Sequence, residues 1–143
     1  MNENDSDVTP LRVLVVDDDA VDRMAVRRHL ARTGLSARAD EAEGVLEAIG
    51  RLTDEPYDCV LLDFNLPDGD GLTFLRGLRT AGIRVPVIML TGQSDPEIAA
   101  DLVMAGASDY LPKSLLSPGR LLQSLTRCCA AHASVRRAIE SAE

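Results

Sequence analysis

Short runs of apolar residues alternate along the chain with longer segments of helical pattern. The strongest runs are continuous, which is typical of strands buried on both faces of a parallel sheet. We expect strands at 13–16, 36–39, 60–62, 85–90 and 108–111. Helices are expected at 20–33, 41–52, 71–81, 96–105 and 118–140. This alternation predicts an α/β domain with a doubly wound sheet that carries helices on both faces.

Residues that commonly begin or end helices lie at the borders of these segments. Three predicted helices stop before a glycine, where a left-handed cap is usual, namely Gly34, Gly82 and Gly106. Asp95-Pro96 and Ser117-Pro118 each pair a capping side chain with a proline at the first helical position. Asp40 is expected to cap the helix at 41–52.

The length and composition are those of one soluble globular domain. The chain has 143 residues, of which 45% are apolar and 27% charged, enough for a core without metal or disulfide staples. A net charge of −8 and only 3% aromatic residues, with no Trp, argue against nucleic-acid binding. Residues 1–111 hold 10 basic and 21 acidic residues, whereas residues 112–143 hold five basic and two acidic ones. Only the last segment is therefore expected to attract an acidic partner.

The sequence has no feature of export or membrane insertion. The first residues are polar and acidic, the reverse of a signal peptide, and no apolar run approaches the roughly 18 residues that span a bilayer. Cys59, Cys128 and Cys129 lack the spacing of a metal site or a disulfide framework, which suits a reducing compartment. We expect a cytoplasmic protein that does not enter a membrane.

Polar side chains follow the predicted strands at the end where doubly wound sheets bind their ligands. They are Asp17, Asp18 and Asp19 after the first strand, Asp63 after the third, Thr91 after the fourth and Lys113 after the last. Carboxylates this close repel one another and need a cation, and an all-oxygen set favours Mg²⁺. A carboxylate beside Mg²⁺, with an ammonium and a hydroxyl group opposite, can accept and hold a phosphoryl group.

Four motifs carry these residues: VLVVDDD at 13–19, VLLDFNLPDGDG at 60–71, VIMLTG at 87–92 and DYLPK at 109–113. In content, order and separation they resemble the receiver domain of response regulators in two-component signalling, in its stand-alone, CheY-like form. The resemblance extends from about residue 12 to about residue 125. It implies a five-stranded parallel sheet in the flavodoxin-like order 2-1-3-4-5.

The resemblance implies a metal and phosphoryl site built from four of these positions. Asp63 would be the phosphoacceptor, and Asp18 would bind Mg²⁺ directly. Asp17 would complete the acidic pocket, and Asn65 would supply a backbone carbonyl to the metal. The Asn65 side chain lies where the family tunes the rate of dephosphorylation.

The family's phosphorylation switch is implied by three further positions. Thr91 would hydrogen-bond the phosphoryl group, and Lys113 would pair with it. Tyr110 stands where family members carry an aromatic side chain that moves inward as the Thr91 hydroxyl is recruited. One phosphoryl group would thereby bias a two-state element.

By this resemblance the protein is expected to be a Mg²⁺-dependent phosphoacceptor switch in a phosphorelay. A histidine kinase or a phosphotransfer protein would phosphorylate Asp63, and the chain would catalyse only its own phosphotransfer and dephosphorylation. Because no DNA-binding or catalytic segment follows, the output would be a contact with a downstream protein through 95–105, 108–111 and the start of 118–140. The apolar candidates on that face are Ala99, Leu102, Val103 and Met104.

The last predicted helix, of about 23 residues or roughly 35 Å, is longer than a sheet needs for cover. Its apolar positions repeat by four and three, the spacing of a coiled-coil seam, at Leu121, Leu125, Cys128, His132, Val135 and Ile139. Two interpretations stay open, an amphipathic helix with a frayed tail and a helix for kinase docking or a homodimer. We therefore divide the chain into a disordered lead at 1–10, a receiver domain at 11–126 and a helical extension at 127–143.

One departure from the family pattern concerns Lys113. The family usually has a proline straight after the lysine, in a cis peptide, whereas here Ser114 follows and Pro112 precedes. A cis bond without proline costs ~2.5–4 kcal/mol. Either the bond is trans and the loop differs, or other contacts hold it, which leaves the reach of Lys113 open.

Two other functions compete with this interpretation. The run at 15–21 also fits the opening motif of haloacid-dehalogenase-like phosphohydrolases, with Asp17 as nucleophile and Asp19 as general acid. The phosphohydrolase family has a pair of acidic residues after its lysine. Here the only acidic residues after Lys113 are Glu140 and Glu143, at the end of the sequence, so this pair is missing. The second alternative is an interaction module that works without phosphorylation, although all the pocket residues are present.

Other polar residues receive a structural interpretation. His29 and His132 lie on helical segments without a nearby second metal ligand, so we expect them on the surface or in packing. Asp68, Asp70 and Asp109 are expected to serve turns and helix caps.

Overall fold

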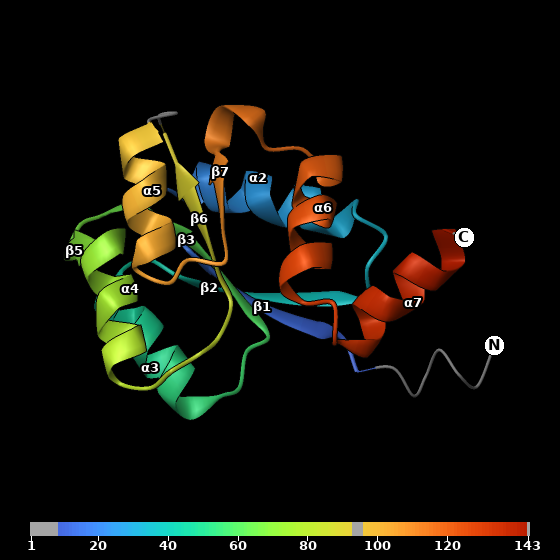
Figure 1. The fold of residues 1–143 in the computed structure, drawn as a ribbon, viewed down its shortest axis with the longest axis horizontal. Helices are drawn as coiled ribbons and strands as arrows, with labels where there is room; N and C mark the ends of the chain where they lie inside the picture. The colour runs from blue at the N-terminus through green and yellow to red at the C-terminus, as the bar shows by residue number, and fades with distance from the viewer. Residues whose placement is uncertain (1–8, 93–95, 143) are drawn as a thin grey trace.

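A parallel sheet of five strands, in the order β2-β1-β3-β6-β7, forms the centre of the structure (Figure 1). The computed structural model describes residues 9–92 and 96–142. The strands are β1 (Leu11–Val16), β2 (Ala37–Ala42), β3 (Cys59–Asp63), β6 (Val87–Thr91) and β7 (Asp109–Pro112). All their pairings are parallel, as continuous apolar runs favour. The predicted sheet and its strand order are confirmed, whereas most of the predicted disordered lead lies outside the described residues.

Six α-helices occur in the described ranges: α2 (Ala20–Ala31), α3 (Val45–Asp54), α4 (Gly71–Thr80), α5 (Pro96–Met104), α6 (Pro118–Cys128) and α7 (Ala133–Ala142). Short strands β4 (Asn65–Leu66) and β5 (Gly69–Asp70) form an antiparallel pair, and η1 (Lys113–Leu115) is a 3₁₀ turn. Three predicted glycine caps have positive φ, 85° at Gly34, 82° at Gly82 and 104° at Gly106. The predicted cap at Asp95 lies outside the described residues. None of the described helices has the length and apolar character that a membrane crossing requires.

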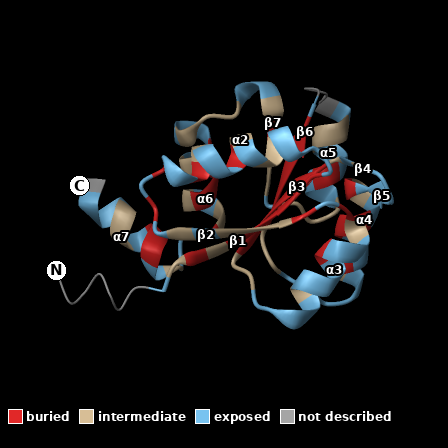
Figure 2. Ribbon diagram, turned by 180° about the vertical axis from the view of Figure 1, so that it is seen from behind, coloured by how far each residue is buried: buried red, intermediate tan, exposed pale blue. Residues whose placement is uncertain are grey.

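The two faces of the sheet carry separate cores, because side chains alternate along each strand. On β1, Leu11, Val13 and Val15 point to the face covered by α2 and α6. Leu14 and Val16 point to the opposite face, which α3, α4 and α5 cover. Figure 2 shows the buried residues concentrated in the central strands β1, β3 and β6. Both layers of helices hold the carboxyl ends of these strands in place at one edge.

The start of α3 differs from the prediction. The helix begins at Val45, and Asp40 does not cap it. Asp40 instead lies in β2, where its carboxylate accepts a hydrogen bond from the Tyr57 hydroxyl at 2.7 Å. The predicted cap is therefore wrong, because the strand extends further along the chain than the apolar run indicates.

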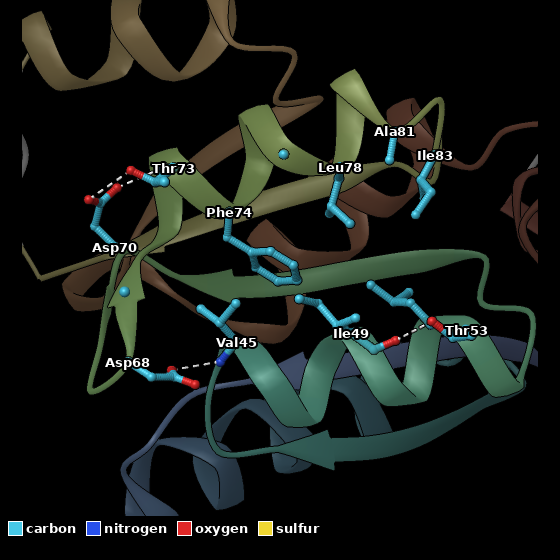
Figure 3. A pocket seen from close by; sticks show the side chains of 13 residues that line it. Val45, Ile49, Thr53, Asp68, Asp70, Thr73, Phe74, Leu78, Ala81 and Ile83 are labelled. Atoms are coloured by element: carbon cyan, nitrogen blue, oxygen red, sulfur yellow. Dashed lines mark hydrogen bonds between the residues drawn. The ribbon is translucent and has the colours of Figure 1, made fainter.

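Asp68, between β4 and β5, caps α3 from a distant loop. Its carboxylate oxygens accept hydrogen bonds from the backbone N–H group of Val45 at 2.8 Å (Figure 3) and from that of Leu46 at 3.1 Å. These bonds lower the pKa of Asp68. A Cβ at Gly44, the N-cap residue, would lie 2.6 Å from Asp68 Oδ1, so glycine is needed for this approach.

Replacing Asp68 with alanine is expected to destabilise the fold. Two N–H groups at the start of α3 lose their acceptor, and the helix N-terminus loses a neighbouring negative charge. We expect the melting temperature, followed by circular dichroism, to fall by a few degrees. Asp54→Ala is the control, because it removes an exposed carboxylate from the last residue of the same helix, where negative charge is unfavourable. An equal loss in both variants would contradict the capping role.

The prediction of one helix over 118–140 is wrong, because α6 ends at Cys128 and α7 begins at Ala133. In the turn between them, His132 Nδ1 accepts a hydrogen bond from the Ser134 N–H at 3.1 Å. The Ser134 hydroxyl donates to the carbonyl oxygen of Thr9 at 3.0 Å. These contacts stabilise the turn and hold α7 near the beginning of β1, and Figure 1 shows α7 turned away from the axis of α6.

The predicted coiled-coil seam is consequently not formed on one helix. Leu121 and Leu125 lie on α6 and Val135 lies on α7, and all three are fully buried in the core on the α2 side of the sheet. Since these side chains are used within the chain, they are not available to a second copy. The prediction of one extended last helix is corrected accordingly, whereas a homodimer that involves this segment stays a prediction.

Candidate functional site

Acidic side chains meet where β1 and β3 end. Val16 pairs with Leu62 in the parallel register, so the next residues along the two strands, Asp17 and Asp63, lie side by side. Both are buried, with 1% and 6% of their surface exposed, whereas Asp18 is exposed. One carboxylate oxygen from each of Asp17, Asp18 and Asp63 lies within 4.8 Å of the others. The structure therefore brings together the three predicted acidic residues.

Lys113, the first residue of η1, reaches this acidic cluster. Its Nζ lies 2.7 Å from Asp17 Oδ2, 2.8 Å from Asp22 Oδ2 and 3.3 Å from Asp63 Oδ1. The remaining oxygen of Asp17 accepts the backbone N–H of Asp19 at 2.9 Å. The ammonium group and the carboxylate of the predicted acceptor thus face each other directly.

The backbone shows whether the peptide bond between Lys113 and Ser114 is cis or trans. The part of the chain that the structure describes contains no cis peptide bond, so the bond between Lys113 and Ser114 is trans. The chain turns through η1 instead, where the Leu116 N–H donates to the Lys113 carbonyl oxygen at 3.2 Å. Lys113 therefore reaches the carboxylates from a trans backbone.

The proximity of these charges changes their proton affinities. Burial, with repulsion from Asp17, raises the pKa of Asp63 to about 6, although Lys113 and the Asn65 N–H act in the opposite direction. Burial alone would lower the pKa of Lys113, but hydrogen bonds to Asp17 and Asp22 raise it above its usual value. The lysine stays charged, while the carboxylates around it outnumber it. Such a cluster attracts a further cation.

The donor set fits Mg²⁺. The clustered atoms are carboxylate oxygens of Asp17, Asp18 and Asp63, without the nitrogen or sulfur ligands that favour zinc. Asp18, as the exposed member, offers its carboxylate toward solvent, from which a hydrated ion would arrive. The Asn65 N–H donates to Asp63. A contribution of the Asn65 carbonyl to the metal stays a prediction.

The predicted switch residues, Thr91 and Tyr110, lie on the next two strands of the sheet after the acceptor strand, β6 and β7 respectively. Thr91 ends β6 one residue beyond Leu90, which pairs with Asp63, and Thr91 is buried. Thr91 lines a pocket together with Phe64, Asn65, Gly92 and Ile98. On the next strand Tyr110 is half-buried against the core under α5. Both residues therefore connect the acceptor to the α5 side of the molecule.

The start of α4 is packed directly against the acceptor's backbone. The Gly71 N–H donates to the Phe64 carbonyl oxygen at 2.7 Å. A Cβ at Gly71 would lie 2.9 Å from the Asp63 carbonyl oxygen and 2.7 Å from Met89 Cε, so a side chain there would displace the acceptor loop. Glycine at this position fixes the loop that carries Asp63.

Asp22 and Arg23, in the first turn of α2, belong to this site but were not predicted from the sequence. Asp22 binds Lys113, and the Arg23 guanidinium donates to the Asp17 carbonyl oxygen at 2.7 Å and to Glu41 at 3.0 Å. The signal was available, because α2 starts only four residues after the end of β1 and so places its first turn at the same edge of the sheet.

Asp19, the general acid in the phosphohydrolase alternative, has a structural role. The Asp19 carboxylate accepts the backbone N–H groups of Val21 at 2.8 Å and Asp22 at 3.3 Å and so caps α2. The Lys113 ammonium group lies near both Asp17 and Asp63. Its position therefore suits Asp63 as the nucleophile as well as Asp17, the nucleophile of the phosphohydrolase alternative.

The predicted output face is partly confirmed as exposed surface. On α5, Val103 and Met104 are 60% and 87% exposed. Leu102 is fully buried in the core, so it cannot form the contact that was expected of it, and Ala99 is half-buried. The apolar part of this face consists of Val103 and Met104.

The remaining polar candidates have structural roles. Asp70 caps α4 by accepting the Thr73 N–H at 2.7 Å, as predicted. Asp109 does not serve a turn, because its carboxylate binds the Ser124 hydroxyl at 2.6 Å and Arg127 at 2.7 Å and thereby joins β7 to α6. His132 packs beside Asp58 at 3.4 Å.

A separate pocket of about 380 Å³ lies between α3 and α4 (Figure 3). Its walls are mainly apolar, and Phe74 and Leu78 form part of them. Its polar side chains bind within the chain, as Asp68 does to Val45 and Asp70 does to Thr73. This pocket holds none of the clustered carboxylates and has no part in the acidic site.

Comparison with known proteins gives one consistent family. The sequence profile of the response regulator receiver domain matches residues 13–126. Response regulator MprA of Mycobacterium sp. (strain KMS) is 38% identical over 104 residues, which are 73% of this chain and 44% of that protein. The DNA-binding transcriptional regulator NtrC of Proteus hauseri is 41% identical over 102 residues, 71% of this chain and 21% of that protein. The chain thus spans less than half the length of these relatives. Since one of them is named as DNA-binding, the expectation that this chain binds no nucleic acid stays a prediction.

Solved structures agree with the sequence matches. The chemotaxis response regulator CheY4 of Vibrio cholerae superposes with a TM-score of 0.74 at 28% sequence identity. The match covers 84% of this chain and 99% of that chain. The structural similarity therefore extends over most of this chain.

Proposed function

The chain belongs to the response regulator receiver family of two-component signalling, and from this premise we propose that it is a Mg²⁺-dependent phosphoacceptor switch with Asp63 as the acceptor. The observation that carries the proposal is the position of Lys113 Nζ, 3.3 Å from the Asp63 carboxylate, within a cluster of three acidic side chains. A carboxylate that faces a fixed ammonium group in an all-oxygen metal site is suited to phosphoryl transfer.

The chemistry follows from these positions. An oxygen of the Asp63 carboxylate attacks the phosphorus of the donor, a new O–P bond forms, and the donor leaves with the electron pair of the bond that breaks. Mg²⁺, when held by Asp17, Asp18 and Asp63, supplies positive charge at the transferring oxygens. Lys113, whose Nζ lies 3.3 Å from the Asp63 carboxylate, supplies a second positive charge. The product is an acyl phosphate on Asp63.

The donor would be a histidine kinase or a phosphotransfer protein, and the chain would act on no other substrate. It would transfer the phosphoryl group to itself and hydrolyse its own acyl phosphate slowly. The Thr91 hydroxyl, one strand away from Asp63, would then bind the phosphoryl group while Tyr110 moves inward. This movement would alter the α5 face, where Val103 and Met104 offer apolar contacts to a downstream protein in the cytoplasm.

Incubation of the wild-type protein with Mg²⁺ and acetyl phosphate tests the proposal. We expect the intact mass to rise by one phosphoryl group, and borohydride trapping followed by peptide mapping to locate it on Asp63. The same incubation with EDTA in place of Mg²⁺ is expected to give no label, since the clustered carboxylates would then repel the anionic donor.

Other outcomes would assign the protein elsewhere. Label on Asp17 would favour the phosphohydrolase alternative and remove Asp63 from its proposed role. No label with either acetyl phosphate or a phosphorylated histidine donor would leave an acidic site that does not accept phosphate. The α5 face would then have to act as an interaction module without phosphorylation.

A further inference from the structure

The Lys113 ammonium group makes its two shortest contacts with residues other than the acceptor. Nζ lies 2.7 Å from Asp17 and 2.8 Å from Asp22, but 3.3 Å from Asp63. An ammonium group has three N–H donors. Two of them therefore serve Asp17 and Asp22, and the third faces the acceptor carboxylate at the longest of the three distances.

Asp17 and Asp22 differ in how readily they can release the lysine. The Asp17 side chain is only 2% exposed, so without Lys113 it would be a buried charge with a single backbone partner on its other oxygen. The Asp22 side chain is 41% exposed and lies in the first turn of α2, where water and the helix N-terminus also stabilise a carboxylate. Asp22 is thus the partner that Lys113 can leave at low cost.

A phosphoryl group on Asp63 brings negative oxygens to the side of Asp63 that faces Lys113. These oxygens and the Asp22 carboxylate then compete for the same ammonium group, and the two anions also repel each other. Arg23, the next residue, does not relieve this competition, because its guanidinium binds the Asp17 carbonyl oxygen and Glu41. Asp22 therefore competes with the phosphoryl group for the positive charge of Lys113.

We propose that Asp22 is a positioning residue that binds the Lys113 ammonium group, keeps it from the incoming phosphoryl group and thereby slows phosphorylation of Asp63. This inference rests on the proposed function. Asp22 touches neither the donor nor the phosphoryl group but acts through Lys113, whose donors it shares with Asp17. Release of Lys113 from Asp22 is then one part of the reaction's barrier.

The test compares Asp22→Asn, which keeps the shape and removes the charge, with Asp22→Glu, which keeps the charge. We expect Asp22→Asn to be phosphorylated by acetyl phosphate about threefold to tenfold faster than the wild type at the same Mg²⁺ concentration. Its affinity for beryllofluoride, a mimic of the phosphoryl group measured from amide chemical shifts, should rise by a similar factor. Asp22→Glu should stay near the wild type in both measurements.

Asp54→Asn is the control for net charge, because it removes one exposed carboxylate from the far end of α3 and should change neither quantity. Equal or slower phosphorylation of Asp22→Asn, in a preparation whose wild type is labelled on Asp63, would overturn the role of Asp22. Equal effects of Asp22→Asn and Asp22→Glu would also overturn it, since shape rather than charge would then matter. A wild type that takes up no label would overturn the proposed function and the role of Asp22 with it.

Discussion

Asp63→Asn is expected to abolish phosphoryl uptake and, at the same time, to stabilise the fold at neutral pH. The amide has no anionic oxygen to attack phosphorus, so incubation with acetyl phosphate and Mg²⁺ should leave the intact mass unchanged. The same substitution removes a buried carboxylate whose charge is disfavoured by burial and by Asp17, as its pKa of about 6 indicates. A residue kept for its reactivity would thus be unfavourable for stability.

The stabilisation depends on pH in a defined direction. The folded-state pKa of Asp63 is raised from 3.8 to about 6, so the folded protein binds this proton more tightly than the unfolded chain does. The contribution of Asp63 to stability is therefore most favourable below pH 3.8 and is lost as the pH rises to about 6. The free energy of unfolding of the variant should exceed that of the wild type by about 1–2 kcal/mol at pH 7, allowing for partial screening by solvent.

Urea unfolding of both proteins in EDTA, repeated from pH 4 to pH 8, measures this difference. It should be close to zero at the acid end, grow up to about pH 6 and stay constant above it. Asp18→Asn is the matched control, because Asp18 belongs to the same cluster but is exposed, and its substitution leaves the buried Asp63 carboxylate in place. A variant less stable than the wild type at pH 7 would mean that Lys113 more than offsets the cost of burying the Asp63 charge.

Much of the fold and the centre of the site follow from local sequence patterns. Continuous apolar runs end at acidic residues, and parallel strands deliver those ends to one edge, which is why Asp17 and Asp63 meet. Glycines mark helix ends because positive φ is easy only for them, as at Gly34 and Gly82. Strand ends and helix ends depend on residues that are close together in sequence, so the local sequence pattern predicts them.

The missed features depend on contacts between distant residues. The cap of α3 comes from Asp68, which is 23 residues away from Val45. The turn before α7 contains no glycine or proline and keeps the helical spacing of apolar residues. It is stabilised by a hydrogen bond from Ser134 to Thr9, 125 residues away. Asp22 was missed for another reason, because it lies in the first turn of α2 and not directly at the end of a strand.

Val135→Asp is expected to destabilise the fold by about 2–4 kcal/mol, because Val135 is fully buried in the core on the α2 side. The carboxylate would not enter the core. Instead α7 would leave its position near Thr9, and the loss is therefore limited to the packing energy of that helix. Chemical unfolding at pH 7 measures the free energy, and hydrogen exchange should show α7 unprotected in the variant.

Ile139→Asp separates this explanation from the coiled-coil interpretation, in which Val135 and Ile139 both lie in the seam. In the structure Ile139 is 36% exposed, so a carboxylate there keeps contact with water and should cost less than about 1 kcal/mol. Sedimentation should find both variants and the wild type in the same oligomeric state. If the two substitutions instead destabilised the protein equally and dissociated a dimer, the helix would act between chains and the buried position of Val135 would be wrong. The ratio of the two effects therefore decides whether the C-terminal helix completes the receiver core or joins two copies of it.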